Sequence, residues 1–198
     1  MSARSSNRSP GGCQGALGRA HVGLSRVGTV SLLVVVLRYS QALWAQWVDF
    51  DAPSATFARA LCSAATFFGG APRRFVFEEP DCRILSWDGR AEHFADVLQA
   101  VARHLGCELE LWHERWCGPA TRAAERLIWA TSCPAVATLA ASNAALRLVL
   151  TQARRLPHPH EPARSVAEVL AAERAQLSPV PVSCSSLTAW LEDEDHDG

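Results

Sequence analysis

Two glutamates, Glu78 and Glu125, stand where carboxylates could hold a divalent metal ion. Glu78 closes an alternating, β-rich segment at residues 73–78, and Glu125 lies early in the helical pattern that follows the next predicted strand. Chemistry in α/β sheets collects at strand ends, so both side chains could face one end of the sheet. Mg²⁺ prefers oxygen ligands and lets a nucleic-acid phosphate complete its shell, which is the arrangement that phosphoryl transfer uses. The alternative is that both are ordinary surface charges among 20 acidic residues.

Arginine supplies all 19 basic residues of the chain, and lysine is absent. Arg73 and Arg74 precede the strand that ends in Glu78, and Arg122 and Arg126 lie on either side of Glu125. These four arginines are the candidate contacts to DNA phosphates, because nonspecific binding needs several such charges. The alternative is a solvated surface whose arginines reflect a GC-rich coding bias. Five acids in the last seven residues form a tail that would repel DNA.

The seven cysteines contain no CxxC pair, so zinc-ribbon and thioredoxin-type sites have no support. We expect most of them to be reduced thiols in the core. A signal peptide is the alternative, because Arg4 and Arg8 precede an apolar run at residues 27–37. Cleavage near Ala45 would leave six cysteines for a secreted, disulfide-containing domain. The leading segment exceeds the roughly 15–30 residues of a signal, and the run is shorter than the ~20 residues that span a bilayer. We therefore expect a cytoplasmic protein without a membrane segment.

Hydrophobic periodicity predicts an α/β domain with a mixed sheet covered by helices. Two or three strands lead the sheet, and Ser165 with Glu168 forms a capping box at the start of the last helix. A linker at residues 154–162 precedes it, in which His158 and His160 are expected to be solvated. The predicted strands lie at residues 30–37, 42–50, 73–78 and 107–112, and the predicted helices at residues 53–68, 94–105, 120–131, 136–150 and 165–177.

Composition divides the chain into four parts. Residues 1–19, rich in Ser, Gly, Arg and Asn, are expected to form a disordered leader. Residues 20–153 carry the α/β pattern of the core, and residues 154–181 hold the linker and the last helix. Residues 182–198 are expected to be an acidic, disordered tail.

Several motifs resemble one family of enzymes. FFGGAPRR at residues 67–74, followed by the strand FVFEE, resembles the helix-to-strand junction of IstA-type transposases of bacterial insertion sequences. In that family a similar run leads into a strand that ends in a catalytic Asp-Asn. SVAEVLAAERAQLSPVP at residues 165–181 is similar to the family's Ala-Glu-Glu-Arg helix and its Leu-Pro ending. The resemblance covers about residues 20–181, and the combination of these two motifs is its most specific part.

The resemblance implies an RNase H-like, retroviral integrase-type core that cuts and joins DNA with three carboxylates and Mg²⁺. The family's first Asp falls on Gly23, its second on Glu78 and its third on Glu125. The leading carboxylate is therefore missing, and a longer one replaces the second. Because Mg²⁺ demands near-octahedral geometry, we expect a transposase or integrase-family protein that has lost DNA strand transfer. The alternative is a noncatalytic DNA-binding or transposase-interacting remnant.

Partners are implied by the same resemblance. The family acts on DNA ends, as multimers and with an ATPase helper protein, so DNA, a homo-oligomer and such a helper are the expected partners. The family's N-terminal helix-turn-helix region has no counterpart in residues 1–20. We therefore expect recognition of specific DNA ends to be lost.

Overall fold

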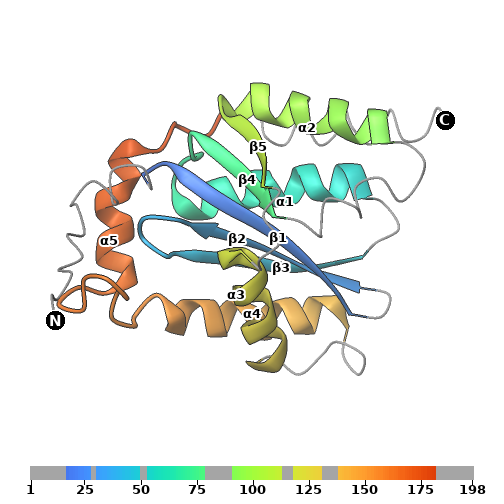
Figure 1. Cartoon of the computed structure of the whole chain (residues 1–198). Coiled ribbons are helices and arrows are strands. Elements are labelled where there is room, and N and C mark those ends of the chain that lie inside the picture. The colour runs from blue at the N-terminus through green and yellow to red at the C-terminus, as the bar shows by residue number, and fades with distance from the viewer. Residues whose placement is uncertain are drawn as a thin grey trace, which may run out of the picture.

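Apolar and alternating segments build a five-stranded mixed sheet (Figure 1). The computed structural model describes residues 17–27, 30–49, 53–78, 91–112, 118–130 and 138–181. The strand order is β3-β2-β1-β4-β5. β2 pairs antiparallel with β1 and β3, whereas β4 is parallel to both β1 and β5. The strands are β1 (Arg19–Val27), β2 (Val30–Leu37), β3 (Leu43–Asp49), β4 (Arg74–Glu78) and β5 (Glu108–Trp112).

Helices cover both faces of this sheet (Figure 1). On one face, α1, α2 and α5 share an apolar core with Val22, Leu33 and Phe77 of the strands. On the other face, α3 and α4 pack against Leu32, Val34 and other alternate strand residues. The helices are α1 (Pro53–Phe68), α2 (Ala91–Leu105), α3 (Pro119–Ala130), α4 (Leu139–Ala153), α5 (Val166–Glu173) and the short 3₁₀ helix η5 (Arg174–Gln176).

The expected α/β fold is confirmed at the level of a mixed sheet flanked by helices. Three strands lead the sheet, where the sequence left two or three open, and the additional strand is β1. Within the apolar run at residues 27–37, which resembles the core of a signal peptide, residues 30–37 form the inner strand β2. Within the described residues, no helix has the length and apolarity to cross a membrane. Residues 1–16 and 182–198, which contain most of the predicted leader and the whole tail, lie outside the described residues.

The junction between α1 and β4 is held by the segment that follows α5. Nε of Arg174 donates to the carbonyl of Phe68 at 2.8 Å, and Ala71 and Ser178 exchange two backbone hydrogen bonds of 2.8 Å each. A Cβ added to Gly70 would collide with Leu177, so this approach requires glycine. The FFGG run and the segment after α5, which together carry the family resemblance, therefore lie in direct contact.

Candidate functional site

The middle of β1 and the end of β4 bring together His21, Gly23 and Glu78 beneath α3. In the parallel pairing of β1 with β4, His21 lies opposite Val76 and Val22 opposite Phe77, so Gly23 comes next to Glu78. Successive side chains point to opposite faces of a strand, which places His21, Gly23 and Glu78 on the face that α3 covers. The sequence resemblance aligns the family's first two carboxylates with Gly23 and Glu78. The structure sets these two positions side by side.

The carboxylate of Glu78 is buried, with 1% of the residue exposed, and accepts hydrogen bonds at both oxygens. Nδ1 of His21 lies 2.9 Å from Oε1, and the backbone N of Ala120 donates to the same oxygen at 3.0 Å. Oε2 accepts from the backbone N and from Oγ1 of Thr121, both at 2.9 Å. The two amides belong to the first turn of α3, where backbone N–H groups lack partners within the helix. Glu78, on β4, therefore accepts hydrogen bonds from backbone N–H groups at the N-terminus of α3 and caps that helix.

These hydrogen bonds keep Glu78 ionised in spite of its burial. Burial alone would raise the pKa of Glu78, but the hydrogen bonds from His21 and from the amides of Ala120 and Thr121 lower it by more. The pKa consequently lies below its ordinary value. An ionised carboxylate has no proton to donate, so Nδ1 of His21 carries the hydrogen of their contact. The positive end of the α3 dipole favours the same charged state.

Two glycines allow α3 to approach the sheet this closely. A Cβ on Gly118, directly before the helix, would fall on the carboxyl group of Glu78. A Cβ on Gly23 would lie 3.0 Å from the backbone N of Thr121 and 3.1 Å from Cβ of Ala120. The space that a first carboxylate would need on β1 is thus occupied by the first turn of α3.

Glu125, the second predicted metal ligand, lies one turn further along α3 and is exposed. Each oxygen of Glu78 already has two hydrogen-bond donors, one of them a backbone amide, so a cation could be bound only after these bonds were broken. No three His, Cys, Asp or Glu side chains among the described residues come together as a metal site. The residues at this position therefore do not fit Mg²⁺ in this arrangement, and the metal role of Glu78 and Glu125 stays a prediction.

The four predicted DNA contacts lie at two places. At the start of β4, Arg73 is exposed, while Arg74 forms ion pairs with Glu108 and Glu110 of β5, the latter at 2.8 Å. These carboxylates already neutralise the charge of Arg74. The hydrogen bonds and charges of Glu108 and Glu110 also raise its pKa.

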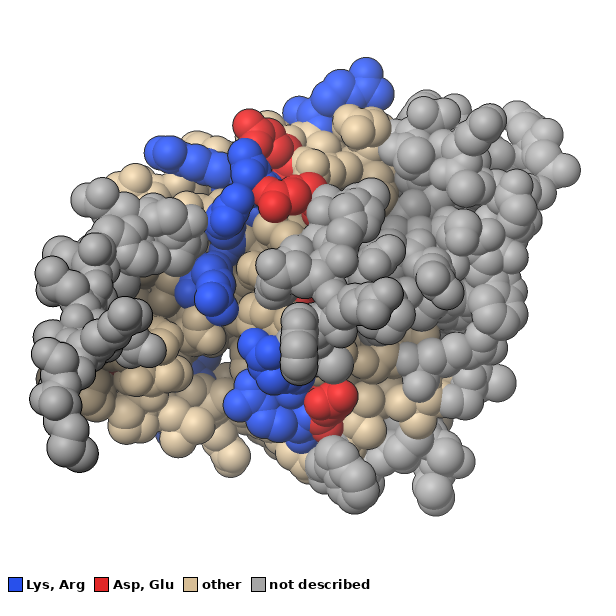
Figure 2. All heavy atoms as spheres, viewed as in Figure 1, with Lys and Arg blue, Asp and Glu red and all other residues tan. Residues whose placement is uncertain are grey.

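Arg122 and Arg126, the other two predicted contacts, are exposed on α3. Nε of Arg126 donates to the carbonyl of Arg122 at 3.2 Å. In Figure 2, basic atoms form a stripe from the upper part of the visible face toward its middle, beside acidic atoms, and a further basic group lies below it, over the region of α3. The phosphate-binding role of all four arginines stays a prediction.

A second buried carboxylate, Glu173, carries no signal of its role in the sequence. Oε2 of Glu173 accepts from the backbone N of Ser40 at 3.1 Å, and Oε1 has no hydrogen-bond partner among the described residues. Burial raises its pKa, which hydrogen bonds from Ser40 offset only in part. Sequence reasoning missed Glu173, because the local sequence of α5 does not show that the turn after β2 lies beside this helix.

The expectation that His158 is solvated is wrong. His158 is 3% exposed, and its Nε2 donates to the carbonyl of Tyr39 at 3.0 Å. Nδ1 accepts from the backbone N of His160 and of Glu161, so the ring is in its neutral Nε2–H form. The segment is held by hydrogen bonds to the turn after β2. His160 is exposed, as expected.

Cys107, directly before β5, carries a free thiol. Burial raises its pKa to about 11. Such a thiol is protonated at neutral pH and is a poor nucleophile. Cys62 is buried in α1, as expected for a core residue.

Comparison with protein-family models finds none that matches the chain. Comparison with curated proteins finds no match either.

Proposed function

We propose that the chain is an RNase H-like, integrase-type domain of the IstA transposase lineage that binds DNA without cutting it. The strand order supports this proposal, because three antiparallel strands followed by two strands parallel to the first are the arrangement of RNase H-like domains. The contact between the FFGG run and the segment after α5 supports it as well, since both motifs of the resemblance pack on the same sheet.

The observation that supports the loss of catalysis is that the first turn of α3 fills the space beside Gly23 and Glu78. At the position of the first carboxylate stands Gly23, against which α3 packs. The neighbouring Glu78 uses its carboxylate to hold His21 and the first turn of α3. A group that stabilises the transition state must be free to meet the developing charge. Glu78 instead has a structural role.

DNA binding is proposed for the arginines, with Arg122 and Arg126 of α3 as its centre and Arg73 as a further contact. All three are exposed. Guanidinium groups bind phosphate oxygens without regard to base sequence, so we expect nonspecific, salt-dependent binding to duplex DNA. We place the protein in the cytoplasm, where it meets DNA and, by the same lineage, a second copy or an ATPase helper.

Fluorescence anisotropy with a labelled duplex of arbitrary sequence tests DNA binding, over a series of salt concentrations. Neutralising Arg122 and Arg126 together, as R122Q/R126Q, is expected to weaken binding and to reduce the salt slope by about 1 for each phosphate that is no longer bound. Arg103→Gln is the matched control, because Arg103 is an exposed arginine on α2, at the opposite face of the sheet. Absence of binding at low salt, or an equal weakening in the control, would refute the proposal.

Calorimetric titration with Mg²⁺ and with Mn²⁺, followed by a nicking assay on supercoiled DNA, tests the loss of catalysis. We expect neither metal binding at the strand ends nor cleavage. Metal binding or cleavage that disappears in both Glu78→Ala and Glu125→Ala, with each variant shown to be folded, would restore the two carboxylates to a catalytic role.

A further inference from the structure

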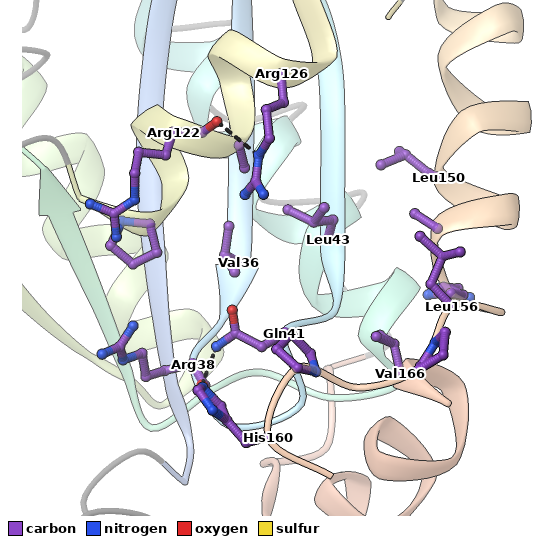
Figure 3. Close-up of a pocket in the computed structure, with 16 residues that line it drawn as sticks. Val36, Arg38, Gln41, Leu43, Arg122, Arg126, Leu150, Leu156, His160 and Val166 are labelled. Atoms are coloured by element: carbon purple, nitrogen blue, oxygen red, sulfur yellow. Dashed lines mark hydrogen bonds between the residues drawn. The ribbon is translucent and has the colours of Figure 1, made fainter. Parts of the chain in front are cut away.

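A cavity of about 500 Å³ lies between α3, α4 and the turns that follow β2 and α4 (Figure 3). Its size falls in the range of about 300–1,000 Å³ that is typical of sites for small ligands. Its wall is basic on one side and apolar on the other. Sixteen described residues line it, among them Arg38, Arg126, Leu43, Leu150, Leu156 and Val166.

The basic side of the cavity is assembled from three separate parts of the chain. Arg122 and Arg126 come from α3, Arg38 from the turn after β2, and His160 from the turn that follows α4. Figure 3 shows Arg126 reaching from α3 into the space above Val36, with Arg122 and Arg38 to one side of it. Like charges that gather around one space repel one another, and an anion between them removes that repulsion.

No acidic side chain is found among the sixteen described residues of the lining. The nearest acid along α3 is Glu125, which is exposed and is not one of them. Arg154 also lines the cavity, but its guanidinium group contacts Phe67. It lies 3.6 Å from the centre of the Phe67 ring and donates to the carbonyl of Phe67. Arg38 and Arg126 therefore supply positive charge on the basic side of the cavity.

The backbone that presents Arg38 is held in an uncommon conformation. Gln41 has a φ of 58°, in the left-handed region of backbone conformation that residues other than glycine rarely adopt. Its Nε2 donates to the carbonyl of Arg38 at 2.7 Å, and the backbone N of Arg38 donates to the carbonyl of Arg19 of β1 at 2.8 Å. Strain of this kind concentrates at functional sites and persists where the surroundings over-determine it. Here the two hydrogen bonds hold the turn from which Arg38 reaches the cavity.

We propose that this cavity binds an organic phosphate of about the size of a nucleotide. Arg38 and Arg126 bind the phosphate, because guanidinium groups match its oxygens in geometry and charge. The uncharged part of the ligand packs against the apolar wall formed by Leu43, Leu150, Leu156 and Val166. The phosphate could belong to a free nucleotide or to the 5′ end of a DNA strand, which present the same chemistry. The proposal goes beyond duplex binding and does not depend on it.

Isothermal titration calorimetry of the full chain tests the proposal with deoxyadenosine 5′-monophosphate, and with deoxyadenosine as the probe that lacks the phosphate. The nucleotide is expected to bind and the nucleoside to show no binding. Arg126→Gln and Arg38→Gln are each expected to weaken nucleotide binding by about tenfold, as removal of one charge-assisted hydrogen bond predicts. Arg147→Gln is the matched control, because Arg147 is exposed on α4 and is not among the described lining residues.

A short single strand, with and without a 5′-phosphate, separates the two sources of the ligand. Tighter binding of the phosphorylated strand than of the free nucleotide assigns the cavity to a DNA end, and the reverse assigns it to a free nucleotide. Absence of nucleotide binding to the folded wild-type chain would overturn the proposal, as would an equal weakening in Arg147→Gln. Duplex binding measured by anisotropy is a separate readout, so failure of one proposal leaves the other intact.

Discussion

Nδ1 of His21 lies 2.9 Å from Oε1 of Glu78, and the two residues come from neighbouring parallel strands beneath the first turn of α3. The contact joins β1, β4 and α3 through one carboxylate. Both side chains are almost entirely withdrawn from solvent, so the hydrogen bonds are made in surroundings of low dielectric constant, where they are strong and costly to break. The stability of this end of the sheet therefore depends on the charge of Glu78.

Glu78→Gln is expected to destabilise the fold by about 3 kcal/mol, because it removes hydrogen bonds to a buried charged group and leaves a buried donor unpaired. The amide nitrogen of Gln would face a backbone N–H of α3, because each oxygen of Glu78 accepts from one of the two amides. Urea denaturation at pH 7 measures the decrease. Glu108→Gln, which removes an exposed carboxylate, is the control and should cost no more than about 1 kcal/mol. Equal stability of Glu78→Gln and the wild type would contradict the structural role.

The same variant carries a pH signature. Because the pKa of Glu78 is lowered on folding, its stabilisation is complete above the ordinary value of 4.5 and is lost as the pH falls through the lowered pKa. The difference in unfolding free energy between the wild type and Glu78→Gln should therefore shrink below pH 4.5. A difference that stays constant down to acid unfolding would contradict the lowered pKa.

The pH dependence of stability that Glu173 contributes has the opposite sign. Its pKa is raised, so above the ordinary value of 4.5 the folded chain retains a proton that the unfolded chain has released. Stability consequently falls as the pH rises through this window, up to the raised pKa. Glu173→Gln should remove that slope in denaturation measured from pH 4 to pH 8, whereas Glu125→Gln, at an exposed position, should retain it. An unchanged slope in Glu173→Gln would assign the pH dependence to other groups.

Gly23→Asp, which places a carboxylate at the position aligned with the family's first Asp, is expected to destabilise the chain without giving Mg²⁺-dependent cleavage. A side chain at this position meets the first turn of α3, and such overpacking costs about 1–3 kcal/mol. Thermal unfolding and a nicking assay measure the two effects. Ser25→Asp introduces the same charge two residues further along β1 and serves as the control. Cleavage gained by Gly23→Asp alone would show that the strand ends can still assemble a metal site.

Cys107 is expected to resist alkylation in the folded chain. With a pKa of about 11, about one thiol in a thousand is ionised at pH 8, and the thiolate is the nucleophile. Iodoacetamide labelling followed by peptide mapping measures the rate in the native chain and in guanidinium chloride. Rapid labelling of the native chain at the rate of the unfolded one would contradict the raised pKa.

Much of the fold was predictable because its signals are local. The almost wholly apolar run of β2 identifies a strand buried on both faces, and the capping box of Ser165 and Glu168 is confirmed. β1 was harder to assign, because Gly23 and Ser25 interrupt its β-forming residues. The presence of most strands and helices can thus be predicted from short-range patterns. The weakest pattern belongs to β1, the strand that carries His21 and Gly23.

The partners of the buried polar groups could not be predicted, because they are distant in the sequence. Glu78 meets a residue 57 positions earlier and a helix start 42 positions later. His158 is bound by a carbonyl 119 positions away, which is why composition alone suggested a solvated linker. The sequence could predict that Glu78 lies at the end of a strand. It could not predict that the carboxylate caps α3.

The contact of Ser178 with Ala71 also sets the order in which the chain can complete its fold during synthesis. The junction between α1 and β4 gains its final hydrogen bonds only when residues about a hundred positions later have left the ribosome. Until then Phe68 and Gly70 lack the cover that Arg174 and Leu177 provide. Nascent chains expose unfinished apolar surface of this kind to aggregation and to chaperones. The segment after α5 therefore completes the junction between α1 and β4.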